Sequence, residues 1–283
     1  MEAQGENLSK DISIENYVTF FDRNYLPQGI ALYLSMVRHL PHFKLWIVCI
    51  DDDTFRIIDQ MEDSRVVAID FDSFENDHLK QARTNRSYVE FLWTLTPFVS
   101  SYIFNVDDTT DRVTYIDADM YFLRNPREIF TFFDLSGCSA LITSHDFSSK
   151  HDHGDKNGKF CVQFMPFNRN GSATILEWWG ERCLESCSSK AENGVFGDQK
   201  YIEEWPDIFP DLVAIYPSIG SFLAPWNMDK YPSTTGYLYH FHSLRILKDK
   251  KVALVNADYT VPDDFIKEVY KPYLLDLSCA QTM

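Results

Sequence analysis

The chain has 283 residues, of which 45% are hydrophobic and 15% aromatic, a composition that supports a sizeable globular core. It carries 26 Lys and Arg against 42 Asp and Glu, so the formal net charge is −16. This acidic balance argues against nucleic acid and against broad adhesion to anionic lipid, so an anionic ligand needs a local metal ion or a local basic cluster.

The first 15 residues are polar and acidic, and they lack the order of basic and then apolar residues that marks a signal peptide. No apolar run is long enough for a transmembrane helix. Without a secretion signal, the six cysteines indicate reduced thiols. We therefore expect a loose leader over residues 1–15 and a cytoplasmic protein.

Short apolar strands alternate with helical segments through the first half of the chain. The strands are predicted over residues 17–21, 45–50 and 66–69. Helices are predicted over residues 27–39 and 57–61, and residues 77–103 hold two helical segments, of which the second runs over 87–103. This alternation predicts βαβ units around a largely parallel sheet, with ligands bound beyond the carboxyl ends of the strands. Neither a dinucleotide-binding glycine motif nor a P-loop follows the first strand.

The stretch with the clearest chemistry is residues 113–122, where an apolar strand runs into two carboxylates. Asp117 and Asp119 are two positions apart, and alternate side chains of an extended chain share a face, so we expect both to point the same way. Two like charges this close require a cation. A divalent ion with a phosphate ligand suits carboxylate oxygens, whereas the alternative is a solvated strand end before a turn.

Other candidate residues lie on both sides of this stretch. Arg83 and Arg86 belong to the densest basic cluster of the first half, which is either a solvated helix face or a site for phosphate or carboxylate. Gln163 is an amide within the apolar run 160–165, so it either ties down a loop or faces a ligand. The polar stretch 145–159 predicts a loop that closes over the site.

The later motifs combine polar and aromatic residues. Asp198 and Gln199 stand at a predicted helix start, where Asp198 is either an ordinary cap or part of an anion site. Trp226 and Asn227 lie in a loop rich in Gly and Pro, where an exposed Trp could stack on a sugar. The alternation of residues 237–242 predicts a strand with two histidines on one face, either metal ligands or hydrogen-bonded core residues.

The last segment predicts an amphipathic helix that begins near Pro262 and carries one apolar stripe. Its polar face mixes Lys267 and Lys271 with acidic residues, whereas helices that lie on membranes carry a basic polar face. We therefore expect the helix to pack on the main domain or on a second subunit of a homo-oligomer, with at most peripheral membrane contact.

In this order the motifs resemble those of GT-A glycosyltransferases, the retaining nucleotide-sugar transferases of the glycogenin and bacterial lipooligosaccharide galactosyltransferase type. The matching segments are residues 17–20 for the nucleotide-binding start, 115–119 for the metal motif, 160–168 for the Asn-Ala-Gly strand, 197–199 for the Asp-Gln segment and 240–243 for the His-Phe-x-Gly motif. The chain departs from the family in two places. Val162 and Gln163 stand where the family has a pair of small residues, and Arg245 lies one position before the place where the family has a Lys.

The resemblance implies an α/β fold with a single GT-A (Rossmann-like) domain over residues 16–255, whose mixed, mostly parallel central sheet is flanked by helices. The C-terminal amphipathic helix would follow over residues 256–283. The implied activity is the metal-dependent transfer of a sugar from a nucleotide-diphosphate sugar, foremost a UDP-sugar, to a saccharide or lipid-linked acceptor. We expect retention of configuration, in surface polysaccharide or lipopolysaccharide synthesis.

The resemblance also assigns roles to single residues. The implied ligands of Mn²⁺ or Mg²⁺ are Asp117, Asp119 and His240, with His242 as its rival. The implied donor-binding residues are Phe20, Arg83, Arg86, Asp117, Asp119, Arg245, Trp226 and Asn227. The implied catalytic residues are Asp198, Gln199 and Gln163.

Three alternatives stay open at this point. An inverting transferase would use Asp198 as its general base. A non-catalytic nucleotide-sugar binding protein would share the fold without the activity. A phosphatase of the haloacid dehalogenase type also has Asp-x-Asp after a strand, but it needs Thr or Val where this chain has Tyr121.

Overall fold

Eight strands form the central sheet of the computed structural model, which describes residues 14–190, 196–247 and 251–280. In spatial order they are β3 (Val66–Asp70), β2 (Phe43–Cys49), β1 (Glu15–Phe21), β4 (Arg112–Ile116), β8 (Phe164–Asn168), β6 (Ala140–Ser144) and β7 (Phe160–Cys161), with β9 (Val213–Tyr216) also paired to β6. The first four run parallel, and β8 is antiparallel to both of its neighbours. The prediction of a mixed, mostly parallel sheet is confirmed. Most of the predicted leader, residues 1–13, lies outside the described residues.

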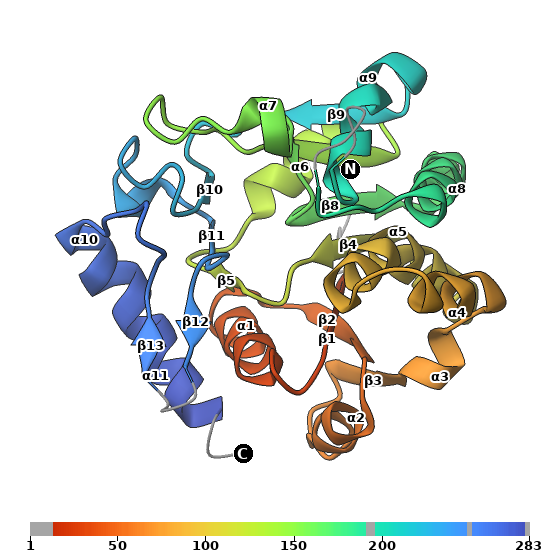
Figure 1. Ribbon diagram of the computed structural model, residues 1–283, viewed down its shortest axis with the longest axis horizontal. Helices are drawn as coiled ribbons and strands as arrows, with labels where there is room; N and C mark the ends of the chain where they lie inside the picture. Colours follow the sequence, from red (N-terminus) through yellow and green to blue (C-terminus); the bar gives the residue numbers. More distant parts are fainter. Residues whose placement is uncertain (1–13, 191–195, 248–250, 281–283) are drawn as a thin grey trace, which may run out of the picture.

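Helices cover both faces of this sheet because its strands are apolar on both sides. Within β1, Tyr17 and Phe21 enter one core cluster, and Val18 between them enters the other. The helices of the Val18 side are α3 (Phe71–Phe74), α4 (Asp77–Thr84), α5 (Tyr88–Val106), α8 (Arg169–Glu185) and α9 (Trp205–Ile208); those of the Tyr17 side are α1 (Leu26–His39), α2 (Asp52–Asp59) and α6 (Arg127–Ser136) (Figure 1).

A smaller sheet and the C-terminal segment complete the described chain. The sheet has the order β10 (Phe222–Leu223), β11 (Leu238–His240) and β5 (Met120–Phe122), and a hairpin of β12 (Arg245–Ile246) and β13 (Val252–Ala253) follows it. Short helical pieces are α7 (Gly154–Asn157), η1 (Gln199–Glu204) and η2 (Ser233–Thr235). The C-terminal helix, made of α10 (Asp263–Phe265), the π turn η3 (Ile266–Tyr270) and α11 (Lys271–Ala280), packs along α1 (Figure 1). No helix in the described ranges could span a membrane.

Two predicted strands differ from the structure. The apolar run 160–165 is interrupted, because Val162 and Gln163 form a turn between β7 and β8. The alternating run 237–242 is a strand only as far as His240, where β11 ends. Both interruptions lie at the carboxyl edge of the sheet, beside the acidic turn that leaves β4.

Candidate metal centre

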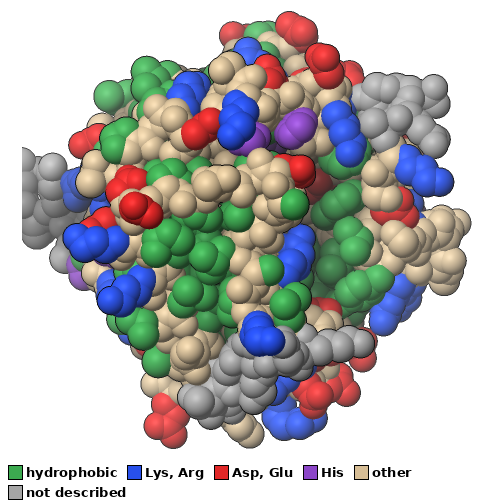
Figure 2. All heavy atoms as spheres, turned by 60° about the vertical axis from the view of Figure 1, so that its left-hand side comes forward, with side chains coloured by type: hydrophobic (Ala, Val, Ile, Leu, Met, Phe, Trp, Pro, Cys, Tyr) green, Lys and Arg blue, Asp and Glu red, His purple; other side chains and the backbone are tan. Residues whose placement is uncertain are grey.

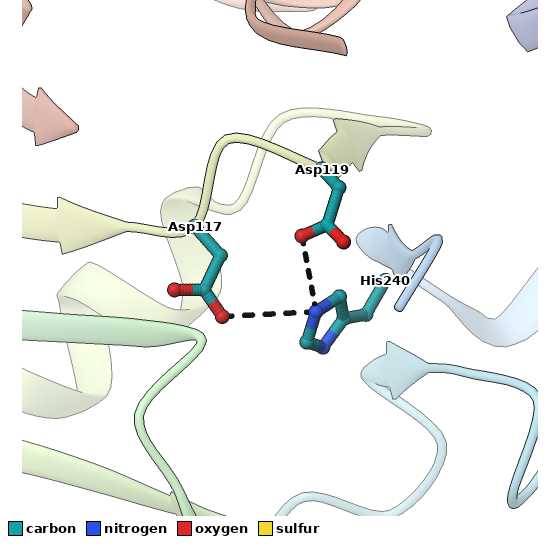
Figure 3. A group of neighbouring side chains, drawn as sticks. All are labelled: Asp117, Asp119 and His240. Atoms are coloured by element: carbon teal, nitrogen blue, oxygen red, sulfur yellow. Dashed lines mark ion pairs between the residues drawn. The ribbon is translucent and has the colours of Figure 1, made fainter. Parts of the chain in front are cut away.

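Asp117 and Asp119 lie in a tight turn that joins the central sheet to the smaller one. The backbone N–H of Met120 donates to the carbonyl of Asp117 over 3.1 Å, and β5 begins at Met120. The expectation that strand alternation aligns the two carboxylates is therefore wrong, because neither residue is in extended strand. The turn itself directs both carboxylates toward the ring of His240 (Figure 3).

His240 reaches the two carboxylates from β11, the strand that pairs with β5 in the smaller sheet. It pairs with Met120 across the antiparallel strands β11 and β5, and the N–H of Phe241 donates to the carbonyl of Asp119 over 2.9 Å. The Nε2 atom of His240 lies 3.1 Å from Asp119 Oδ1 and 3.6 Å from Asp117 Oδ2. Strand pairing thus brings together three side chains that are remote in the sequence.

Gln163 fixes the orientation of this histidine. Its Oε1 atom lies 2.9 Å from Nδ1 of His240, so Nδ1 carries the proton that is donated and Nε2 faces the carboxylates. The backbone carbonyl of Gln163 also accepts the N–H of Asp117 over 3.2 Å. The side chain of Gln163 is only 1% exposed. The side-chain amide of Gln163 thus orients His240, and its backbone carbonyl holds the turn.

The two carboxylates favour a positive charge at Nε2 of His240. Burial disfavours a charged imidazole, but the carboxylates of Asp119 and Asp117 outweigh it and raise the pKa of His240 well above its ordinary value. Burial also opposes ionisation of Asp119, yet the charge of His240 prevails and lowers the pKa of that carboxyl. A proton on Nε2 therefore balances the two acids in the absence of a metal ion.

The same three ligand atoms fit a divalent metal ion. They lie within 4.8 Å of one another, and this is the sole such group of His, Cys, Asp or Glu within the described ranges. Two carboxylate oxygens and an imidazole nitrogen suit Mn²⁺ or Mg²⁺, and the hydrogen bond from His240 to Gln163 is the support that metal-bound histidines usually have. His242, the rival ligand, is exposed and outside the group, with its ring centre 5.8 Å from that of His240.

Asp198 is a second buried acid near this group. It lies in the turn before η1, is 4% exposed, and has one carboxylate oxygen with no hydrogen-bond partner within the described chain. Burial raises the pKa of Asp198 to about 7, and the negative charge of Asp117 adds to this effect. The Trp179 indole holds the Asp198 carbonyl over 2.8 Å. Gln199 turns away instead and donates to the Asn157 carbonyl of the loop 145–159 over 2.8 Å.

Trp226 is not the exposed platform that the sequence suggested, since only 5% of it is exposed. Its indole N–H donates to the His145 carbonyl over 2.7 Å, and its ring contacts those of His240 and His242 edge to face, each at 5.5 Å. The Gly and Pro signals correctly predicted a loop, but the loop folds inward. Asn227 is fully buried and bonds to the backbone of its own loop and of His145.

The four other predicted donor residues occupy different places. Phe20 is half-buried, with its ring 5.9 Å from that of Tyr115. The Arg83 guanidinium pairs with Glu75 at 3.3 Å. The Arg86 guanidinium binds the carbonyls of Cys183 and Leu184 at the end of α8, each over 2.8 Å, and the Thr94 hydroxyl. The positive charge of Arg245 acts on both Tyr25 and His242, beside the metal group.

A cavity of about 600 Å³, which was not predicted from the sequence, lies at the carboxyl ends of β2 and β3. Its lining residues are mainly charged: Arg23, Asp51, Asp52, Asp53, Arg56, Asp70, Asp72 and Arg83, with Ile50 and Phe71. The acidic run after β2 was a signal, but carboxylates after a strand more often cap the next helix. The turn from Asp22 to Tyr25 lies between the cavity and the metal group. Arg23 lines the cavity, and the negative charges of Asp119 and Asp117 add to the effect of burial in raising the pKa of Tyr25.

Figure 2 shows histidine and acidic side chains next to one another at the upper end of a hollow on this face, whose wall carries hydrophobic side chains. Asp117 and Asp119 each keep part of their surface open to solvent. Solvent therefore reaches both acids of the turn.

The chain is similar in sequence to two proteins of Bacillus subtilis. No known protein-family profile matches it. It is 27% identical to uncharacterized protein YfnF of Bacillus subtilis (strain 168) over 278 residues, 91% of each chain, and 26% identical to uncharacterized protein YfnD of the same organism over 282 residues, 94% of this chain and 89% of YfnD.

Among solved structures, the chain resembles the apo form of mouse xyloside xylosyltransferase 1, with a TM-score of 0.57 and 13% identity over 88% of this chain and 100% of that one. It also resembles the galactosyltransferase LgtC in complex with donor and acceptor sugar analogues, with a TM-score of 0.50 and 15% identity over 90% of this chain and 100% of that one. The expected likeness to retaining GT-A transferases is confirmed at the level of structure, and the chain has a GT-A-like fold.

Proposed function

We propose that this chain is a metal-dependent glycosyltransferase that moves a sugar from a nucleotide-diphosphate sugar to a saccharide or lipid-linked acceptor. The observation that carries the proposal is the meeting of Asp117, Asp119 and His240 at the carboxyl edge of a GT-A-like sheet. Mn²⁺ or Mg²⁺ held by these residues would stabilise the negative charge of the leaving diphosphate. The finer parts, a UDP-hexose donor and a role in surface polysaccharide or lipopolysaccharide synthesis, derive from the resemblance of the motifs.

The charged cavity supports a place for the nucleoside. It lies beyond the carboxyl ends of β2 and β3, where open α/β sheets bind ligands. The turn from Asp22 to Tyr25 runs from this cavity toward the metal group. We propose that the donor follows this turn, with its base near Arg83 and its diphosphate between the metal group and Arg245. The Arg86 guanidinium is occupied by carbonyls, so we assign it to the stability of α8.

The sugar of the donor would then lie near Asp198. The oxygen of this carboxyl that has no partner can accept a hydrogen bond from a sugar hydroxyl and so orient the ring. The loop 145–159, held by Gln199 at Asn157, would close over the donor and exclude water, which would otherwise hydrolyse it. Asp198 thus binds and orients the sugar, and Gln199 holds the cover in place.

Retention is the stereochemical outcome that we propose, and inversion is its rival. A pKa of about 7 would let Asp198 act as a general base toward an acceptor hydroxyl, as an inverting route requires. The anomer of the product, read by NMR, decides between the two. A non-catalytic binding protein would bind the nucleotide without consuming the donor sugar.

The test is a thermal-shift panel of UDP, GDP, CDP and ADP on the full chain, with and without Mn²⁺, followed by an assay for release of the diphosphate from matching nucleotide sugars. We expect one nucleotide to raise the melting temperature more strongly when Mn²⁺ is present. Asp119→Asn should lose the Mn²⁺-dependent part of the shift. The proposal is wrong if no nucleotide shifts the native chain under either condition.

A further inference from the structure

The C-terminal helix packs against residues that lie close in sequence to two candidate metal ligands. Tyr121 of β5 is two positions after Asp119, and Phe241 directly follows His240, the last residue of β11. Both rings pack on Tyr273 of α11. The Phe241 and Tyr273 rings are stacked, with centres 3.6 Å apart and planes at 5°, and the Tyr121 ring meets Tyr273 edge to face at 5.2 Å.

A polar network fastens the same helix one turn farther on. The Tyr121 hydroxyl donates to Asp276 of α11 over 2.7 Å, and the guanidinium of Arg38 on α1 binds both partners. Asp276 is buried, whereas 43% of the Arg38 side chain is exposed. The strand that follows Asp119 is therefore held to α11 by a ring contact and by a charge-assisted hydrogen bond, which leaves little freedom for the turn before it.

The hydroxyl of Tyr273 has no structural task within the described chain. It is completely buried and has no hydrogen-bond partner there, although a buried hydroxyl normally has one. Burial raises the pKa of Tyr273 well above its ordinary value, and the negative charge of Asp119 adds to this effect. The ring of Tyr273 packs on Tyr121 and Phe241, which neighbour Asp119 and His240 in the sequence, so its unpartnered hydroxyl belongs to the part of the chain that holds these two ligands.

We propose that Tyr273 is a positioning residue of the metal centre, whose ring fixes the segments bearing Asp119 and His240 and whose hydroxyl supports the Asp119 carboxylate when a cation is bound. This inference rests on the proposed metal-dependent function and extends it. The C-terminal helix, which seemed from its sequence to serve only packing, then forms part of the metal-binding unit.

The test compares two tyrosines of the same helix by removing only their hydroxyls. Tyr273→Phe removes the hydroxyl without a partner, whereas Tyr270→Phe removes one that bonds to Tyr239 over 2.8 Å. Tyr239 is not one of the three candidate ligands. Mn²⁺ affinity is measured by the EPR signal of the free ion, with Mn²⁺ alone and with UDP added, and stability is measured by urea unfolding without metal.

We expect Tyr273→Phe to bind Mn²⁺ about tenfold more weakly than the native chain, the usual effect of losing a partner of a metal ligand. Its stability should be unchanged or higher, because no hydrogen bond is lost. Tyr270→Phe should show the reverse, with lower stability and native Mn²⁺ affinity. Native affinity in Tyr273→Phe, or equal weakening in both variants, would overturn the inference alone. Absence of Mn²⁺ binding by the native chain, with and without UDP, would remove the proposed function and this inference with it.

Discussion

Two acidic regions lie at the carboxyl edge of the same sheet, and their carboxylates have different partners: backbone N–H groups in one region and a histidine ring in the other. Asp51 follows β2 and Asp70 is the last residue of β3, and each is the N-cap of the next helix. Asp51 accepts the N–H groups of Thr54 and Arg23 over 2.8 and 2.6 Å, and Asp70 accepts that of Asp72 over 3.2 Å. These carboxylates satisfy backbone donors that a helix start leaves without partners.

Asp117 and Asp119 follow β4, where the chain turns into another strand and no helix begins. Asp117 receives the Tyr115 hydroxyl over 2.7 Å, and both acids face His240. No helix N-terminus is present to use them, so their charge stays available for a cation. The contrast indicates that the element after the strand decides whether an acid caps a helix or stays available for a cation.

The largest effect is expected from Asp119→Asn, which changes one of the two acids that face His240. The substitution removes one charged ligand and keeps the size of the side chain. We expect loss of Mn²⁺-dependent nucleotide binding and a fall in sugar transfer of at least about a hundredfold, because stabilisation of the leaving diphosphate is lost. Circular dichroism should show an intact fold. Full transfer activity in this variant would remove Asp119 from the site.

Asp198 sharpens the contrast, because it directly precedes the short helix η1 but its side chain makes no capping hydrogen bond to it. Its pKa in the folded chain, about 7, lies above the ordinary value of 3.8, so ionisation opposes folding. The loss of folding stability from this shift is absent when the pH is below the ordinary pKa, grows as the pH rises, and reaches its full size above pH 7. At ~1.4 kcal/mol per pKa unit, this shift corresponds to about 4 kcal/mol.

Asp198→Asn should therefore be more stable than the native chain at pH 8, with a gain that shrinks toward zero as the pH falls to 4. Urea unfolding of both proteins across this range, without metal or nucleotide, measures the difference. A gain that does not change with pH would mean that Asp198 is not held neutral by burial. Transfer activity should fall in the same variant, because the proposed contact with the sugar changes.

How much of the site the sequence predicts depends on whether the signals are local. The strand before Asp117 and the helix that begins at Tyr88 are fixed by neighbouring residues, and both were predicted near their observed bounds. The partnership of Gln163 with His240 depends on the pairing of β5 with β11, which no local pattern encodes. The burial of Trp226 was missed for the same reason, since a loop's composition does not tell which way it folds.

A smaller effect is expected from Gln163→Leu, which removes the acceptor that orients His240. The Nδ1–H group would lose its partner in a buried site, at a cost of about 1–3 kcal/mol. Mn²⁺ affinity should fall about tenfold, as it does when a partner of a metal-bound histidine is lost. Isothermal titration with Mn²⁺ and UDP measures the affinity. Native affinity would show that the turn, and not this amide, sets the position of the ring.

The smallest effects are expected at Asp51, on the capping side of the contrast. Asn caps helices about as well as Asp, so Asp51→Asn should change the free energy of unfolding by only a few tenths of a kcal/mol, whereas Asp51→Ala should lose ~1 kcal/mol. Neither variant should change the affinity for Mn²⁺ alone, because Asp51 has no part in the Asp117, Asp119 and His240 group. Urea unfolding and Mn²⁺ titration of the two variants test both statements. If Asp51→Asn weakened Mn²⁺ binding as strongly as Asp119→Asn does, the two acidic regions would form one cation site, and the division between capping and ligating carboxylates would be wrong.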